Sequence, residues 1–197
     1  VKQVIYCDDA LAEIHSAAIK ISSKEMEQCS ALKSPPGILA VVKTPENQPI
    51  SLGNINVILD DIKDPGNLGT IIRSAAWFGV DRLILTSGCV DAYNPKVVQS
   101  TMGGLFHIPI SRATKAEILE ATKDWNGSLL IADMGGKSSH SMKWPESLAL
   151  VIGSESQGID DLFRAAANEI VCIDKLGKGE SLNAAVSASI LLAQISS

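Results

Sequence analysis

Three short polar motifs stand where apolar, strand-like segments of the sequence end, and their side chains are the ones best suited to chemistry. They span residues 64–73, 153–158 and 177–183, and between them they carry amides, carboxylates, hydroxyls and a guanidinium. In parallel α/β sheets, ligands bind beyond the carboxyl ends of the strands. We therefore expect the three motifs to form one composite site.

Arg73 is the residue of the first motif that a simple turn does not explain. Asp-Pro-Gly-Asn is ordinary turn chemistry, and Asn67 could cap the helix that follows. Arg73, however, lies among apolar residues near a helix N-terminus, where the helix dipole disfavours a cation. A bound phosphate would be stabilised by both the guanidinium and the free amides. A plain turn and a phosphate site both stay open at this point.

The second and third motifs also have structural alternatives. Gly153 follows an apolar run and permits a ligand to approach the backbone, whereas Glu155 also fits an ordinary acid in a first helical turn. The segment lacks the G-x-G-x-x-G pattern, so a nicotinamide site is not indicated. In the third motif Ser181 could cap the last helix, which would leave Asn183 as a mere polar residue. The small residues 184–189 favour close packing of that helix.

Composition narrows the class of protein. The chain has 197 residues, of which 46% are hydrophobic and 20% charged, enough for one α/β domain and a smaller piece. No apolar run reaches the ~18 residues of a membrane span, so we expect a soluble protein without a membrane partner. The four cysteines are scattered and have no nearby histidine, which predicts reduced thiols, no metal and a cytoplasmic location. The net charge of −5 argues against bulk nucleic-acid binding but permits a local basic patch.

The chain divides into a distinct N-terminal region and a regular alternation of strands and helices. Residues 1–43 form the first region, residues 44–54 read as a linker with two prolines, and residues 55–197 form the main domain. In the first region we expect one or two helices over residues 11–32 and a buried strand over 38–42. The main domain predicts a mostly parallel sheet with helices on both faces. Its expected elements include helices over 70–79, 159–167 and 181–195 and a short strand over 107–110.

Taken together, the motifs resemble those of the SpoU/TrmH group of RNA ribose 2′-O-methyltransferases, within the SPOUT superfamily. The resemblance covers about residues 55–195, with the motifs in the family's order and spacing. The residues that match the family's motifs are Asn67 and Arg73, Gly153 and Glu155, and Ile173 with Ser181, Leu182 and Asn183.

The resemblance implies a fold, a cofactor and partners. The fold would be an α/β domain with a C-terminal trefoil knot, preceded by part of an L30e-like RNA-binding domain in residues 1–43. S-adenosylmethionine would be held by backbone at Gly153, Ile173 and Leu182. The substrate would be a ribose 2′-hydroxyl in tRNA or rRNA, and the protein would be a homodimer with the site near the subunit interface. The implied catalytic residues are Arg73, Asn67, Glu155, Ser181 and Asn183.

Three matters stay open from the sequence: the role of Arg73, the surroundings of Asp174 and Lys175, and the competing functions. Arg73 is either the base, as in family accounts, or a phosphate-bound cation that stabilises the developing alkoxide, since a guanidinium pKa lies above ~12. Asp174 and Lys175 replace the family's Pro and Met, and we expect both side chains to face solvent or to be paired. The competing functions are a non-catalytic RNA-binding paralogue and a small-molecule methyltransferase.

Overall fold

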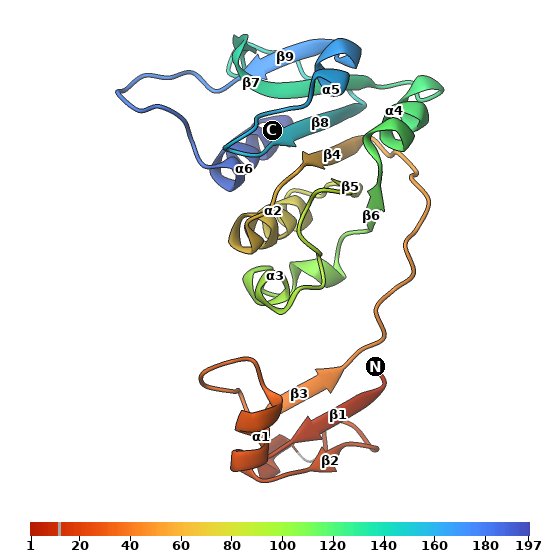
Figure 1. Ribbon diagram of the computed structural model, residues 1–197, viewed down its shortest axis with the longest axis vertical. Helices are drawn as coiled ribbons and strands as arrows, with labels where there is room; N and C mark the ends of the chain where they lie inside the picture. Colours follow the sequence, from red (N-terminus) through yellow and green to blue (C-terminus); the bar gives the residue numbers. More distant parts are fainter. Residues whose placement is uncertain (12) are drawn as a thin grey trace. The chain divides into compact units, whose positions relative to one another are not determined.

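The computed structural model describes residues 1–11 and 13–197, and the chain forms two compact units. The first unit comprises residues 1–46 and the second residues 47–197. Each unit has its own sheet, and both are drawn in Figure 1. The three sequence motifs all fall in the second unit.

The first unit is a small sheet with one described α-helix. Its elements are β1 (Gln3–Tyr6), a 3₁₀ turn (Asp9–Leu11), β2 (Ile19–Lys20), α1 (Ser23–Cys29) and β3 (Ile38–Val41). The sheet order is β2-β1-β3, and Val4 and Met26 are buried. The helix predicted over residues 11–32 is therefore wrong outside α1, although Ala12 lies outside the described residues. Pairing of Ile19 with Ile5 on β1 overrides the local helical pattern.

The second unit is built on a six-stranded sheet within the fully described residues 47–197. Its elements are β4 (Ile55–Asp60), α2 (Pro65–Trp77), β5 (Arg82–Thr86), α3 (Pro95–Ser100), a 3₁₀ turn η2 (Gly104–Phe106), β6 (Ile110–Ala113), α4 (Lys115–Lys123), β7 (Ser128–Ser138), β8 (Leu148–Gly153), α5 (Asp161–Ala166), β9 (Glu169–Cys172) and α6 (Ala184–Ile195). The order is β6-β5-β4-β8-β7-β9, and every pairing is parallel. The predicted parallel α/β sheet is confirmed.

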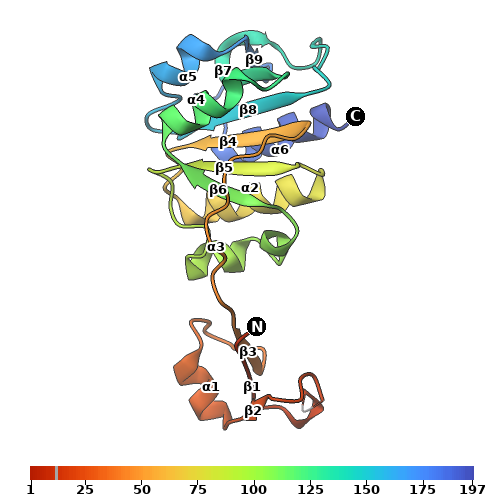
Figure 2. The same cartoon turned by 90° about the vertical axis from the view of Figure 1, so that its right-hand side faces the viewer.

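Both faces of this sheet are buried, as expected for parallel strands. Along β4, Val57 and Leu59 pack into the cluster beneath α2, α3 and α6, whereas Ile58 packs into the cluster beneath α4 and α5. The strand period of two residues sends neighbouring side chains to opposite faces. Figure 2 shows the two helical layers on either side of the sheet.

Three predicted boundaries are wrong by a few residues, and local chemistry explains each. The first helix begins at Pro65 rather than at residue 70, because Asp64 caps it and proline suits its first turn. The strand predicted over 107–110 begins only at Ile110, because Pro109 has no N–H to donate. The last helix begins at Ala184, since Asn183 rather than Ser181 is its cap.

The last helix packs tightly because its residues are small. Ala184, Ala185 and Ala188 are buried in the cluster below β4 and β8. The Ser189 and Ser74 hydroxyls are 2.7 Å apart and join α6 to α2. To reach this position from β9, residues 173–183 run from the edge of the sheet back toward its centre (Figure 1).

Candidate active site

The three polar motifs lie at one edge of the sheet, at the carboxyl ends of β4, β8 and β9. Asp60 and Gly153, the last residues of β4 and β8, are direct partners in the parallel register. The first two motifs therefore begin next to each other, at the ends of two neighbouring strands. The third follows β9 and returns to the same edge at the N-terminus of α6. This arrangement is the composite site that the spacing of the motifs predicted.

A hydrogen-bonded cluster joins one residue from each motif. Glu155 Oε1 accepts hydrogen bonds from Asn67 Nδ2 at 2.6 Å and from Asn183 Nδ2 at 3.1 Å. Asn183 Nδ2 also donates to Asn67 Oδ1 at 2.8 Å. These contacts link residues that are up to 116 positions apart in the chain. The two amides are thereby fixed in orientation by one carboxylate.

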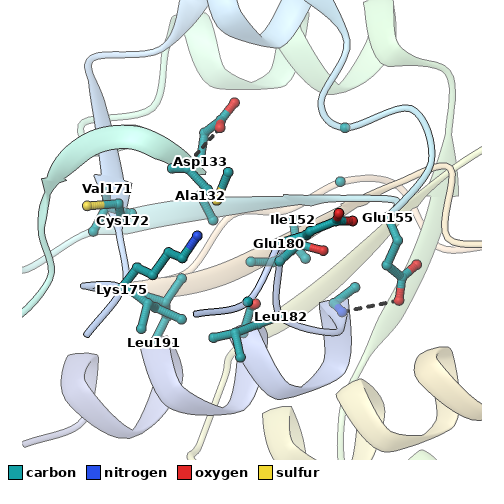
Figure 3. Close-up of a pocket in the computed structure, with 18 of the residues that line it drawn as sticks. Ala132, Asp133, Ile152, Glu155, Val171, Cys172, Lys175, Glu180, Leu182 and Leu191 are labelled. Carbon is teal, nitrogen blue, oxygen red and sulfur yellow. Dashed lines mark hydrogen bonds between the residues drawn. The ribbon is translucent and has the colours of Figure 1, made fainter. Parts of the chain in front are cut away.

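The start of α6 holds Glu155 in place. The Ala184 N–H donates to Glu155 Oε1 at 3.2 Å, and Asn183 Oδ1 accepts the N–H groups of Ala185 and Val186. A carboxylate is favoured at this position, because the N-terminus of a helix carries a partial positive charge. Figure 3 shows Glu155 at the side of the pocket next to α6. The N-terminus of α6 thus satisfies its own amides and anchors the cluster.

Asn67 and Glu155 are each positioned by their own loop. Asp64, the cap of α2, accepts the Asn67 N–H at 2.8 Å and sets the first turn of the helix. The loop of Glu155 closes tightly, because the Gly158 N–H donates to the Ser154 carbonyl at 2.9 Å. A Cβ on Gly153 would lie 2.3 Å from the Gly158 carbonyl oxygen. Gly153 is therefore required by its own loop.

A pocket of about 550 Å³ opens beside the cluster. Ile152, Val171, Leu182 and Leu191 give it an apolar lining, and Glu155 marks its polar side (Figure 3). The three residues expected to hold a cofactor, Gly153, Ile173 and Leu182, all line it, as does Ser181. Its walls come from the ends of β7, β8 and β9 and from the first turns of α6.

The loop before α6 leaves its polar backbone available to a ligand. Within the described part of the chain, the backbone of residues 175–182 makes no hydrogen bond. Asp174 and Lys175 are both exposed, and the Asp174 carboxylate accepts a hydrogen bond from the Ser138 hydroxyl. The expectation that this pair avoids burial is confirmed. Both residues line the pocket, so this exposed loop forms one of its walls.

Two of the predicted catalytic residues stay apart from the cluster. Arg73 is exposed on α2, and among the described residues it has no hydrogen-bond or ion-pair partner. It lies six positions after Asn67, which turns it to another face of the helix. Ser181 is exposed in the pocket wall and makes no hydrogen bond to the described residues. Their predicted roles stay predictions.

Other contributors to the site escaped the sequence analysis. Asp133, Met134 and Cys172 line the pocket from β7 and β9, although nothing in their local sequence marks them. Asp64 had a recognisable signal, since an Asp before a Pro is typical of a helix start. The contact of the Ala184 N–H with Glu155 could not be predicted from the sequence, because it depends on which residue caps α6.

The fold and the site together define a parallel α/β domain with a polar cluster and a pocket at the carboxyl ends of its strands. The profile of the SpoU rRNA methylase family matches residues 54–193, and the chain belongs to this family. The predicted family is confirmed. The match covers all three motifs, the whole six-stranded sheet and all of α6 except its last two residues.

Two curated relatives are named as enzymes that act on 23S rRNA. The chain is 31% identical to the 23S rRNA (guanosine(2553)-2′-O)-methyltransferase RlmP of Bacillus subtilis, over 87% of this chain and 69% of that protein. It is 30% identical to a 23S rRNA (uridine(2479)-2′-O)-methyltransferase of Streptomyces viridochromogenes, over 85% of this chain and 62% of that protein. The chain spans 58% of the length of two mycobacterial relatives that are named as tRNA/rRNA methyltransferases.

Solved structures show the same fold. The SpoU methyltransferase AviRb of Streptomyces viridochromogenes, in complex with AdoMet, superposes with a TM-score of 0.87 at 26% identity, over 100% of this chain and 82% of that one. A TrmH-family protein of Porphyromonas gingivalis gives a TM-score of 0.89 at 28% identity, over 98% of this chain and 81% of that one.

No helix among the described residues is both long and apolar enough to cross a bilayer.

Proposed function

We propose that this protein transfers a methyl group from S-adenosylmethionine to a ribose 2′-hydroxyl of RNA. The observation that carries the proposal is the cluster of Asn67, Glu155 and Asn183 beside the pocket, in a chain of the SpoU rRNA methylase family. The two curated relatives named as 2′-O-methyltransferases both act on 23S rRNA, which favours rRNA over tRNA as the substrate.

The pocket fits S-adenosylmethionine in size and in chemistry. Its volume of about 550 Å³ lies in the range of small-molecule sites, and its lining is mainly apolar. Backbone groups of residues 175–182 are available to pair with the polar edge of an adenine. When bound, the cofactor supplies an electrophilic methyl group on a sulfonium. Gly153, Ile173 and Leu182 are the residues that we assign to hold it.

The cluster would orient the ribose. Glu155 Oε1 binds both amides, and Asn183 uses its two N–H bonds and its oxygen within the protein. Asn67 keeps one N–H and one lone pair of its oxygen, which the contacts with Glu155 and Asn183 hold in a fixed direction. A hydroxyl or a phosphate oxygen is a natural partner for such an amide. Ser181, in the pocket wall, would add one more donor. Much of the rate enhancement would come from holding the 2′-oxygen in line with the methyl group.

We assign Arg73 to the RNA phosphate and to the charge that develops on the 2′-oxygen. Its guanidinium is exposed and free of protein partners in the described chain, so it is available to an anion. Because a guanidinium holds its proton very tightly, electrostatic stabilisation of an alkoxide is favoured over direct proton abstraction. The 2′-hydroxyl proton would then leave to solvent or to a phosphate oxygen.

We further propose a homodimer, a trefoil knot formed by residues 173–195, a cytoplasmic location and an RNA-binding role for residues 1–43. Large apolar side chains exposed around Arg73 support the dimer: Trp77 is 84% exposed, and Phe106 is 72% exposed. The packing of α6 against α2 and β8 supports the knot.

Sedimentation at micromolar concentration tests the dimer. A monomer at that concentration would count against the proposed homodimer.

A methylation assay on defined RNA tests the main proposal. The purified protein is incubated with methyl-labelled S-adenosylmethionine and with unmodified transcripts of 23S rRNA or of tRNA. We expect label in one 23S rRNA nucleotide, and resistance of the adjacent bond to alkali, because a 2′-O-methyl group blocks attack by the 2′-oxygen. Label in a base, or none in any RNA, would contradict the proposal.

The assay also separates the alternative of a non-catalytic RNA-binding protein. Such a protein would bind RNA and leave it unlabelled, whether or not it binds S-adenosylmethionine. Asn67→Ala is the matched control, because it removes one amide of the cluster and leaves the residues that line the pocket intact. Label that persists unchanged with this variant would point to a contaminating enzyme.

A further inference from the structure

A lysine outside the pocket links the loop that leads to Asn67 with the loop that carries Glu155. Lys115 is the first residue of α4, and its ammonium lies 2.9 Å from Asp60 Oδ1, 3.1 Å from Asp61 Oδ2 and 2.9 Å from Asp160 Oδ2. Asp60 ends β4, and Asp61 begins the loop to Asn67. Asp160 caps α5 and follows the loop of Glu155. One cation therefore contacts residues that follow or end both neighbouring strands, β4 and β8.

The position of this cation is unusual for its helix. A positive charge at a helix N-terminus is disfavoured by the helix dipole, and α4 is already capped by Thr114 and Glu117. Burial alone would lower the pKa of Lys115, but its contacts with Asp160, Asp60 and Asp61 raise the pKa by more. The ammonium therefore stays charged, and its contacts with the carboxylates outweigh the local cost.

The carboxylates depend on the ammonium. Asp60 has only 2% of its side chain exposed, and in the described chain Lys115 is the cation in ion-pair contact with it. Three carboxylates meet a single ammonium, so its loss would leave a partly buried group of like charges. Repulsion would then act between Asp160 and the two aspartates at the end of β4. These are the segments whose spacing sets the Asn67–Glu155 hydrogen bond.

Additional contacts make the junction stiff enough to transmit this effect. The Asp160 N–H donates to Asp60 Oδ2 at 2.8 Å, which joins the two loops directly. Asp61 has a φ of +56°, a left-handed conformation that costs energy for a residue with a side chain. Its N–H donates to Thr86 Oγ1, and that hydroxyl donates back to Asp61 Oδ1. The backbone here is held in an unfavourable shape by its surroundings.

We infer that Lys115 is a positioning residue for the Asn67–Glu155–Asn183 cluster, holding the β4 and β8 loops at the spacing that the cluster requires. The inference rests on the proposed function for its consequence in catalysis, although its structural part stands alone. Lys115 does not line the pocket, so it acts through the loops and not on the cofactor.

Lys115→Met tests the inference, because it removes the charge and keeps an unbranched side chain. We expect kcat for methyl transfer to fall about 10- to 100-fold, since small misplacements of reacting groups have effects of this size. The KM for S-adenosylmethionine should change less than about 3-fold, and Lys115→Arg should regain most of kcat. Lys123→Met is the matched control, because Lys123 lies on the same helix but pairs with Glu120 at the surface. This variant should have normal activity.

Hydrogen exchange measures the structural part without any activity. In Lys115→Met we expect amides of residues 61–68 and 154–162 to exchange at least about 5-fold faster, with little change in β5 and β6. If the wild type methylates no RNA, the proposed function fails, and these exchange rates still decide the role of Lys115.

Three results would overturn the inference. They are a kcat of folded Lys115→Met within about 2-fold of the wild type, an equal loss in Lys123→Met, and unchanged exchange in both loops. Should Lys115→Met not fold, Asp160→Asn replaces it. The amide oxygen of the new side chain can still accept the Leu162 N–H and cap α5, whereas the negative charge that pairs with Lys115 is lost. A normal kcat and normal exchange in that variant would equally overturn the inference.

Discussion

Two regions of the carboxyl edge differ sharply in how they are held. The cluster of Asn67, Glu155 and Asn183 is fixed by hydrogen bonds from three segments and by the N-terminus of α6. The loop of residues 174–182, on the other side of the pocket, is exposed and uses its backbone for no hydrogen bond from residue 175 on. The polar groups of the first region are already paired and oriented, whereas the backbone groups of the second are left available to a ligand.

This difference indicates a division of labour. A preorganised cluster suits the reaction, because positioned groups need no rearrangement in the transition state. An open loop suits entry and release of a cofactor, at the expense of affinity, since ordering a loop on binding opposes association. Substitutions in the first region should therefore change kcat, and those in the second should change the dissociation constant.

The largest effect should come from Arg73, which belongs to neither region. Arg73→Ala should lower kcat about 100-fold or more, because a cation that stabilises developing charge contributes on this scale. The dissociation constant for S-adenosylmethionine should stay within about 2-fold, since Arg73 does not line the pocket. Single-turnover assays and calorimetry measure the two quantities. Lys63→Ala, an exposed lysine just before the first motif, is the control. Near-normal turnover by Arg73→Ala would remove this residue from the site.

A smaller effect should follow from Gly153→Ala, at the junction of the two regions. The new Cβ would meet the Gly158 carbonyl oxygen at 2.3 Å, so the backbone must shift. Overpacking of this kind costs about 1–3 kcal/mol. We expect a loss of thermal stability of this size and S-adenosylmethionine binding weakened about 10-fold. Wild-type affinity in this variant would show that the loop adapts, and the pocket would then be less rigid than its contacts indicate.

The smallest effect, and one of opposite sign, should come from stiffening the open loop. Asp174→Pro with Lys175→Met should tighten S-adenosylmethionine binding about 2- to 5-fold, because a restricted loop loses less entropy on binding. Both side chains are exposed, so little packing is lost, although the Ser138–Asp174 hydrogen bond is given up. Lys178→Met, in the same loop, should bind as the wild type does. Calorimetry that finds equal or weaker binding by the double variant would reject the idea that loop order limits affinity.

The sequence predicted that the three motifs meet in space better than it predicted some of the elements around them. The residues assigned to the cofactor line one pocket, and three of the five assigned to catalysis are in contact with one another. In the described part of residues 11–32, the helical prediction was confirmed at α1 and wrong at β2, because the two residues of β2 are stabilised by pairing with β1 and not by their own preferences. The strand expected over 107–110 was misplaced, because Pro109 delays its start.

Lys115 marks the limit of what the sequence could predict. Its position after Thr114 fits a capped helix start, and the capping box was recognisable from Thr114 and Glu117 alone. Its three carboxylate partners come from the end of β4 and from the cap of α5, and they meet only when β4 and β8 are neighbours. No local pattern encodes that meeting.

The sequence by itself determined the order and type of most elements of the main domain, the burial of both sheet faces and the presence of polar residues where strands end. These features follow from apolar runs and helix caps, which act over a few residues. Only the tertiary structure decided the strand order β6-β5-β4-β8-β7-β9, and with it the contact between Asn67 and Glu155, which are 88 positions apart. The physical reason is that an apolar run specifies that a strand is buried on both faces, whereas its neighbour in the sheet depends on the packing of the whole chain.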